Sequence, residues 1–132
     1  MATQSIPLQV RTCECDSCGH VNHAVCLHYL KDAGNELLEN WGFGYWEFVA
    51  AGHCMVITHG DIVYRSAARV DDLLRIETTP LKTRRISGTL SQRIFPGERL
   101  VAGSRVSWCV TDREGNLVRP AAEWNLEQPA LG

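Results

Sequence analysis

Apolar residues follow a clear helical period over residues 23–41. They recur every three or four positions, as expected when one face of a helix packs on a core. The stripe consists of Val25, Tyr29, Leu30, Ala33, Leu37, Leu38 and Trp41. Asn22 is a good N-cap because its side-chain oxygen can accept a hydrogen bond from the first turn, and Gly42 stands where a helix would stop. The pattern predicts one long amphipathic helix.

Most of the rest of the chain has the composition and the alternation of residues that are typical of β-strands. Residues 7–15 alternate loosely between apolar and polar, and four later segments are rich in Val, Ile, Thr and aromatic residues. These segments are residues 54–64, 73–81, 86–95 and 100–111. Short turns join them, whereas parallel neighbours would need long crossovers. We therefore expect an α+β fold in which the helix packs on a curved antiparallel sheet.

Turn-forming residues mark the connections. Asp16-Ser17-Cys18-Gly19 predicts a turn before the helix, because Asp and Ser bond locally to the backbone and Gly accepts a positive φ. The remaining turns are expected at 68–72, 82–85, 96–97 and, as a hairpin before 117–119, at 112–116. The aromatic and glycine-rich residues 42–52 suggest a lid-like connection. Pro120 opens a short terminal turn or helix at 121–127.

Composition is that of an ordinary globular protein, and we expect one domain over residues 1–132. The chain is 45% hydrophobic and 21% charged. A net charge of −2 and a pI near 6.2 give no field that would attract nucleic acid or a membrane surface. No apolar run approaches the ~20 residues of a membrane-spanning helix, and the N-terminus lacks the pattern of a signal peptide. We expect a cytoplasmic protein.

Seven Cys and His side chains lie within sixteen residues before and inside the predicted helix. Cys15-x₂-Cys18 has the spacing of a zinc knuckle, which makes a zinc-binding module one alternative. However, Cys26 and His28 would point about 200° apart around a helix, at ~100° per residue, so they cannot face one ion. We expect no metal or cofactor and free thiols that pack as small apolar groups. A nucleophilic Cys18 near the helix N-terminus is a further reading.

The segment Asp16-Ser17-Cys18-Gly19-His20-Val21-Asn22-His23 resembles the 4-hydroxybenzoyl-CoA thioesterase branch of the hotdog superfamily. That branch shows an Asp, a Gly within a few residues, and an aromatic residue or His seven residues after the Asp, where the central helix opens. Residues 61–72 and 115–120 resemble later parts of the same family, in the same order. The resemblance covers about residues 8–127, and it departs from the family at Ala67, where Pro is common.

The resemblance implies a hotdog fold and the hydrolysis of an acyl-CoA or aryl-CoA thioester. It also implies a homodimer or homotetramer, because relatives form dimers or dimers of dimers. Plant acyl-carrier-protein thioesterases resemble D-x-N-x-H-V at the same place. This chain keeps His20 but has Cys18 instead of the Asn, so an acyl-carrier-protein substrate is the alternative. The same fold can also serve as a non-catalytic module that binds an acyl ligand.

Asp16 and His23 are the predicted catalytic residues. A carboxylate can attack a thioester carbonyl or act as general base for a water molecule. The N-terminus of a helix carries free N–H groups and a partial positive charge, so the N–H near His23 can polarise the carbonyl. The His23 side chain either orients a water or leaving group, or is dispensable beside its own backbone N–H.

Substrate contacts are expected around the same turn and at the pocket mouth. Asn22 and His20 flank the helix start, and Arg65 and Arg69 are candidates for the CoA phosphates. Arg84 and Arg85 are further candidates for contacts with the CoA phosphates. The alternative for each of these arginines is an ordinary solvent-exposed position on a strand.

Overall fold

The computed structural model describes residues 3–40, 45–84 and 86–118. They form a five-stranded sheet, two α-helices and one 3₁₀ turn. The elements are β1 (Gln4–Gln9), η1 (Thr12–Glu14), α1 (His23–Asn40), α2 (Tyr45–Ala50), β2 (Cys54–Tyr64), β3 (Leu73–Thr83), β4 (Ser87–Phe95) and β5 (Ala102–Thr111). The strand order is β1-β3-β4-β5-β2, and every neighbouring pair is antiparallel. This is the predicted hotdog arrangement.

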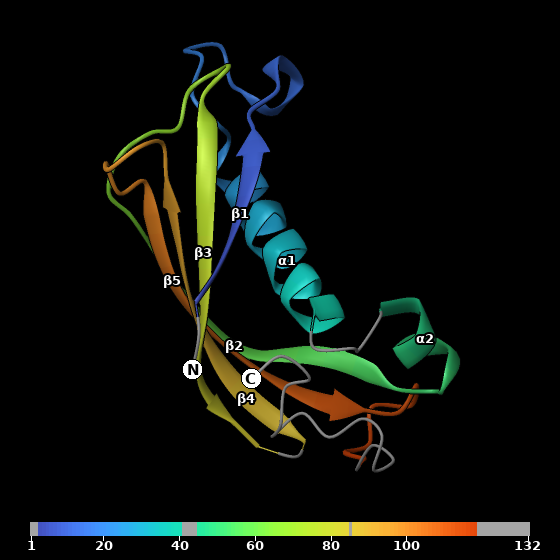
Figure 1. Cartoon of the computed structure of the whole chain (residues 1–132). Helices are drawn as coiled ribbons and strands as arrows, with labels where there is room; N and C mark the ends of the chain where they lie inside the picture. Colours follow the sequence, from blue (N-terminus) through green and yellow to red (C-terminus); the bar gives the residue numbers. More distant parts are fainter. Residues whose placement is uncertain (1–2, 41–44, 85, 119–132) are drawn as a thin grey trace.

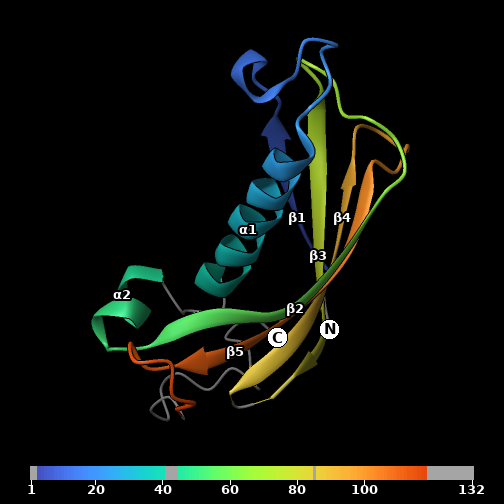
Figure 2. The same ribbon diagram turned by 180° about the vertical axis from the view of Figure 1, so that it is seen from behind.

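The sheet curves around α1, which lies along one of its faces (Figures 1 and 2). The helix turns a buried stripe toward the sheet, consisting of Cys26, Tyr29, Leu30, Ala33 and Leu37. The predicted helical stripe is therefore confirmed, while Trp41 and the predicted stop at Gly42 lie outside the described residues. On the sheet side the most deeply buried residues include Leu74, Ile76 and Ile94. Burial of such side chains is the main favourable term in folding.

The N-terminal strand ends earlier than the alternation over residues 7–15 predicts. β1 pairs with β3 from Gln4 to Gln9 only, and the chain then turns into η1. Local hydrogen bonds account for the change, because the Glu14 carboxylate accepts from the N–H of Arg11 at 2.9 Å and the Glu14 N–H donates to the Arg11 carbonyl at 3.0 Å. A side chain that bonds nearby backbone competes with strand pairing.

The other boundaries agree with the pattern to within a few residues. β3 continues to Thr83, into the stretch expected as a turn, and the expected lid-like connection contains the short helix α2. The hairpin at 112–116 is confirmed: the Asp112 N–H donates to the Asn116 carbonyl at 2.9 Å, and an isolated bridge joins Thr111 to Leu117. Arg85 and the expected terminal element at 121–127 lie outside the described residues.

A second apolar cluster closes the other end of the helix. Trp108 and Val110 on β5 pack with Leu37 on α1, and Trp108 lies opposite Gly88 on β4. A β-carbon placed on Gly88 would lie 2.5 Å from the Trp108 ring, so only glycine leaves room for the indole.

No helix among the described residues is long and apolar enough to cross a membrane.

Candidate active site

Asp16 lies in the turn between η1 and α1, and its own hydrogen bonds hold that turn. Its N–H donates to the His20 carbonyl at 2.8 Å, and its carbonyl accepts from the N–H of Gly19, which has a φ of 76°. The carboxylate oxygen Oδ1 accepts from the N–H groups of Cys18 at 2.9 Å and His20 at 3.1 Å. Within the described residues the second oxygen, Oδ2, has no partner. Asp16 is exposed, so Oδ2 is available to a substrate or a water molecule.

Asn22 caps the helix, as predicted, and thereby determines which N–H groups remain free. Its Oδ1 accepts from the Ala24 N–H at 2.8 Å, and its carbonyl accepts from the N–H groups of Val25 and Cys26. In the described structure the N–H of His23 has no acceptor. The first turn of α1 therefore presents one unpaired donor, at the residue that the sequence predicted.

The His23 side chain is exposed and packs against Tyr64, the last residue of β2. The two rings meet edge to face with centroids 6.1 Å apart. The Tyr64 hydroxyl donates to the His23 carbonyl oxygen at 2.7 Å. Among the described residues the His23 imidazole forms no hydrogen bond, which favours the reading in which the backbone N–H is the functional group.

The loop of residues 65–72 lies against the Asp16 turn and brings Arg69 to it. An isolated bridge pairs His20 with Arg69, and the Val21 N–H donates to the Ala68 carbonyl at 2.8 Å. Asp16, His20 and Arg69 are thus brought together. Arg65 follows Tyr64 at the end of β2, with its N–H bonded to the Val101 carbonyl. Both Arg65 and Arg69 are exposed, so their guanidinium groups can reach an anion in solvent.

Arg99 organises this second loop, a role that the sequence did not suggest. Its Nη1 donates to the Ser66 Oγ at 2.7 Å and to the Ala67 carbonyl at 2.8 Å. No short motif marks such a residue, because its partners lie more than thirty positions earlier in the chain.

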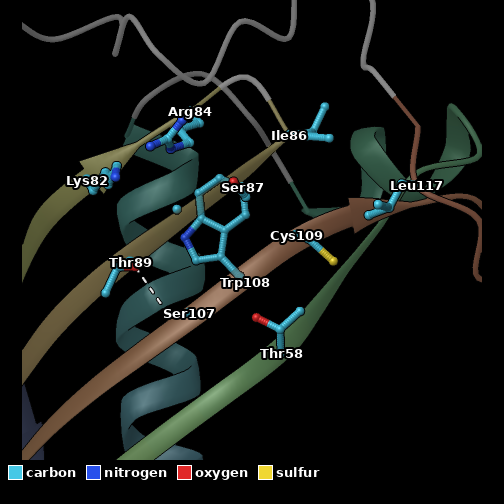
Figure 3. A pocket seen from close by; sticks show the side chains of 11 residues that line it. Thr58, Lys82, Arg84, Ile86, Ser87, Thr89, Ser107, Trp108, Cys109 and Leu117 are labelled. Atoms are coloured by element: carbon cyan, nitrogen blue, oxygen red, sulfur yellow. Dashed lines mark hydrogen bonds between the residues drawn. The ribbon is translucent and has the colours of Figure 1, made fainter.

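Arg84 lies at the other end of the sheet. Together with Lys82 it borders an open hollow of about 510 Å³ near the start of β4 and the end of β5 (Figure 3). The hollow is otherwise lined by Thr58, Ile86, Ser87, Gly88, Thr89, Ser107, Trp108, Cys109 and Leu117. The Asp16 turn lies at the opposite end of the sheet (Figure 1). Among the described residues of one chain, Arg84 is therefore separated from Arg65 and Arg69 by the length of the sheet.

The cysteines near Asp16 do not assemble a metal centre in the described part of the chain, where no three His, Cys, Asp or Glu side chains could hold one ion. All six cysteines are unpaired, and Cys26 is buried in the core. Burial raises the pKa of the Cys15 thiol, and the nearby carboxylates of Asp16 and Glu14 raise it further. A thiol with a raised pKa is a poorer nucleophile at neutral pH.

Comparison with known proteins identifies the family. The sequence model of the thioesterase superfamily matches residues 18–103, well over half of the chain. The chain belongs to the thioesterase superfamily. The matched stretch begins two residues after Asp16, contains His20, Asn22, His23, Arg65 and Arg69, and ends in β5.

Individual members of the thioesterase superfamily are similar over most of this chain. The chloroplastic acyl-acyl carrier protein thioesterase of Arabidopsis thaliana is 31% identical over 90 residues, which cover 68% of this chain. They cover 44% of that protein, so the chain matches less than half of its relative's length. A probable thioesterase from Bartonella henselae has a TM-score of 0.84 at 25% identity, covering 90% of this chain and 99% of that one. A probable thioesterase from Escherichia coli has a TM-score of 0.75 at 26% identity, covering 94% and 98%.

Proposed function

We propose that this member of the thioesterase superfamily hydrolyses an acyl thioester to a free acid and a thiol. Asp16 is its nucleophile or general base, and the His23 N–H stabilises the carbonyl oxygen. One observation carries the proposal: the Asp16 carboxylate, with one free oxygen, and His23, with the single free N–H of the first turn of α1, are seven positions apart and flank one hydrogen-bonded turn.

The arrangement supplies the two things that the reaction needs. The His23 N–H can donate a hydrogen bond to the thioester carbonyl oxygen, which stabilises the negative charge that forms there in the transition state. Asp16 Oδ2 either adds to the carbonyl carbon, giving a mixed anhydride that water then hydrolyses, or removes a proton from the attacking water. In both routes the thiolate leaves and takes up a proton. The turn keeps Asp16 in place because Oδ1 remains bonded to two backbone N–H groups.

Acyl-CoA is the substrate class that we favour, with acyl-carrier protein as the alternative. Exposed Arg65 and Arg69 beside the turn are suited to the phosphates of CoA, or to the phosphopantetheine of a carrier protein. His20 and Asn22 flank the same site and are proposed to border the substrate. The Arabidopsis relative is an acyl-carrier-protein thioesterase by name, which supports testing both carriers.

Assembly and compartment complete the proposal. We infer a homodimer or homotetramer in which β2 meets a second copy of itself, since this long edge strand exposes Val56, Ile57 and Val63. We also infer a cytoplasmic location, because six unpaired cysteines suit a reducing compartment.

A thiol-release assay tests the function directly. Purified protein is mixed with aryl-, short-chain and long-chain acyl-CoA, and with acylated carrier protein, and the free thiol is measured over time. We expect turnover of at least one class, and preference for CoA or for the carrier protein decides between the two substrates. Tight binding of an acyl-CoA without any release of thiol would instead make the chain a binding module.

A further inference from the structure

Glu14 connects three parts of the polypeptide around the candidate site. It lies in η1, two residues before Asp16, and its Oε1 accepts hydrogen bonds from the Arg11 N–H at 2.9 Å and from the Tyr29 hydroxyl at 2.9 Å. Its carbonyl oxygen accepts from the N–H of Asn22, the helix cap, at 3.0 Å. Glu14 thus bonds to three places: Arg11 before η1, Asn22 at the start of the helix, and Tyr29 in the second turn of α1.

Tyr29 gives this connection a rigid base. Only 2% of its surface is exposed, and it packs in the main core cluster with Cys26 and Val10. Burial and the hydrogen bond to Glu14 raise the Tyr29 pKa well above its usual value, so the phenol keeps its proton and remains a donor at neutral pH. The Glu14 carboxylate is therefore held against a side chain that cannot move without disturbing the core.

The backbone bond from Asn22 to Glu14 completes the frame. Asp16 lies between these two residues, and its Oδ1 is engaged by the N–H groups of Cys18 and His20 inside the same turn. The turn is therefore internally stiff, and its placement relative to α1 depends on the residues that attach it to the helix. Glu14 makes two of these attachments: its backbone carbonyl accepts from Asn22, and its carboxylate accepts from Tyr29.

We propose that Glu14 is a positioning residue, which through Tyr29 and Asn22 holds the Asp16 carboxylate at a fixed distance from the His23 N–H. The proposal rests on the function proposed above. Glu14 does not touch the reacting atoms. A misplacement of about 1 Å in a catalytic group can lower the rate ~10²-fold, so loss of the attachment should be seen in kcat.

Three variants separate positioning from other roles. Glu14→Ala removes the acceptor, Glu14→Gln keeps an oxygen that can accept both bonds, and Tyr29→Phe keeps the buried ring but removes the hydroxyl. Glu36→Ala, which removes an exposed carboxylate from α1, is the control. We expect Glu14→Ala and Tyr29→Phe to lower kcat by about 10–100-fold with KM within about threefold of wild type. Glu14→Gln and Glu36→Ala should stay within about threefold of wild type in kcat.

Amide hydrogen exchange on the same proteins gives a readout that does not depend on turnover. The N–H of Asn22, which donates to the Glu14 carbonyl across this attachment, should exchange faster in Glu14→Ala and Tyr29→Phe, and at the wild-type rate in Glu14→Gln. If Glu14→Ala retains kcat within about threefold, or if Glu14→Gln is as slow as Glu14→Ala, the positioning role is wrong. If wild-type protein hydrolyses no thioester, the proposed function fails and exchange alone decides: faster exchange upholds the positioning, and unchanged exchange overturns it.

Discussion

The Tyr64 hydroxyl donates a hydrogen bond to the carbonyl oxygen of His23, with 2.7 Å between the two oxygens. Tyr64 is the last residue of the edge strand β2, and His23 is the first residue of α1. Burial raises the Tyr64 pKa, so the hydroxyl remains a donor at neutral and mildly alkaline pH. The contact fixes the first residue of the helix from the carbonyl side and leaves its N–H free.

His23→Pro tests whether that N–H is the functional group. Proline is favoured at the first helical position, where its missing N–H costs the helix no internal bond, so α1 should still form. We expect kcat to fall by about 10²–10³, the usual cost of one oxyanion-hole donor. His23→Ala is the matched control, because it removes the imidazole and keeps the N–H, and it should retain kcat within about tenfold. Equal losses in both variants, measured by steady-state thiol release, would assign the role to the imidazole.

Gly88→Ala tests the packing of the second apolar cluster. The added methyl group would lie 2.5 Å from the Trp108 ring and 2.9 Å from the Lys82 carbonyl oxygen. Overpacking of this kind costs about 1–3 kcal/mol, so the denaturation midpoint in urea should fall while the m-value is unchanged. Gly103→Ala on β5, where a β-carbon meets open space, is the control and should lose much less. Equal stability of the two variants would refute the close approach.

Much of the fold could be predicted from the sequence because its apolar residues recur at the regular spacings of a helix and of strands. The buried stripe of α1 and the strands β2 to β5 follow from local patterns that the tertiary structure does not override. The end of β1 could not be predicted, because it depends on a bond between Glu14 and the Arg11 N–H that alternation does not encode.

The candidate site was predictable only where its residues are close in sequence. Asn22 as the cap, and hence the free N–H of His23, follow from general rules for helix starts. The apolar stripe predicts that the Tyr29 ring is buried in the core. The spacing of apolar residues does not identify Glu14 as the hydrogen-bond partner of the Tyr29 hydroxyl. Arg99 and Tyr64 act through contacts more than thirty residues away, which one sequence does not reveal.

The exposed edge of β2 leads to a prediction about assembly. An eleven-residue edge strand with exposed apolar side chains is a ready template for pairing with a second chain. We expect light scattering at micromolar concentration to show a dimer or tetramer, and Ile57→Lys to shift the population toward monomer. Leu73→Lys is the control, since Leu73 is 66% exposed on β3, which has a neighbour on each side. A monomeric wild-type protein would contradict the proposed assembly.

Asp16→Asn measures the central claim most directly. The amide keeps an oxygen for the N–H groups of Cys18 and His20, so the turn and the fold should survive. It cannot attack a carbonyl or accept a proton from water. Asp32→Asn, at an exposed position on α1, is the control for loss of a carboxylate. In steady-state thiol release from the best substrate, we predict that Asp16→Asn lowers kcat by about 10²–10⁴ with little change in KM, while Asp32→Asn behaves like wild type. Turnover by Asp16→Asn within about threefold of wild type would contradict the carboxylate mechanism.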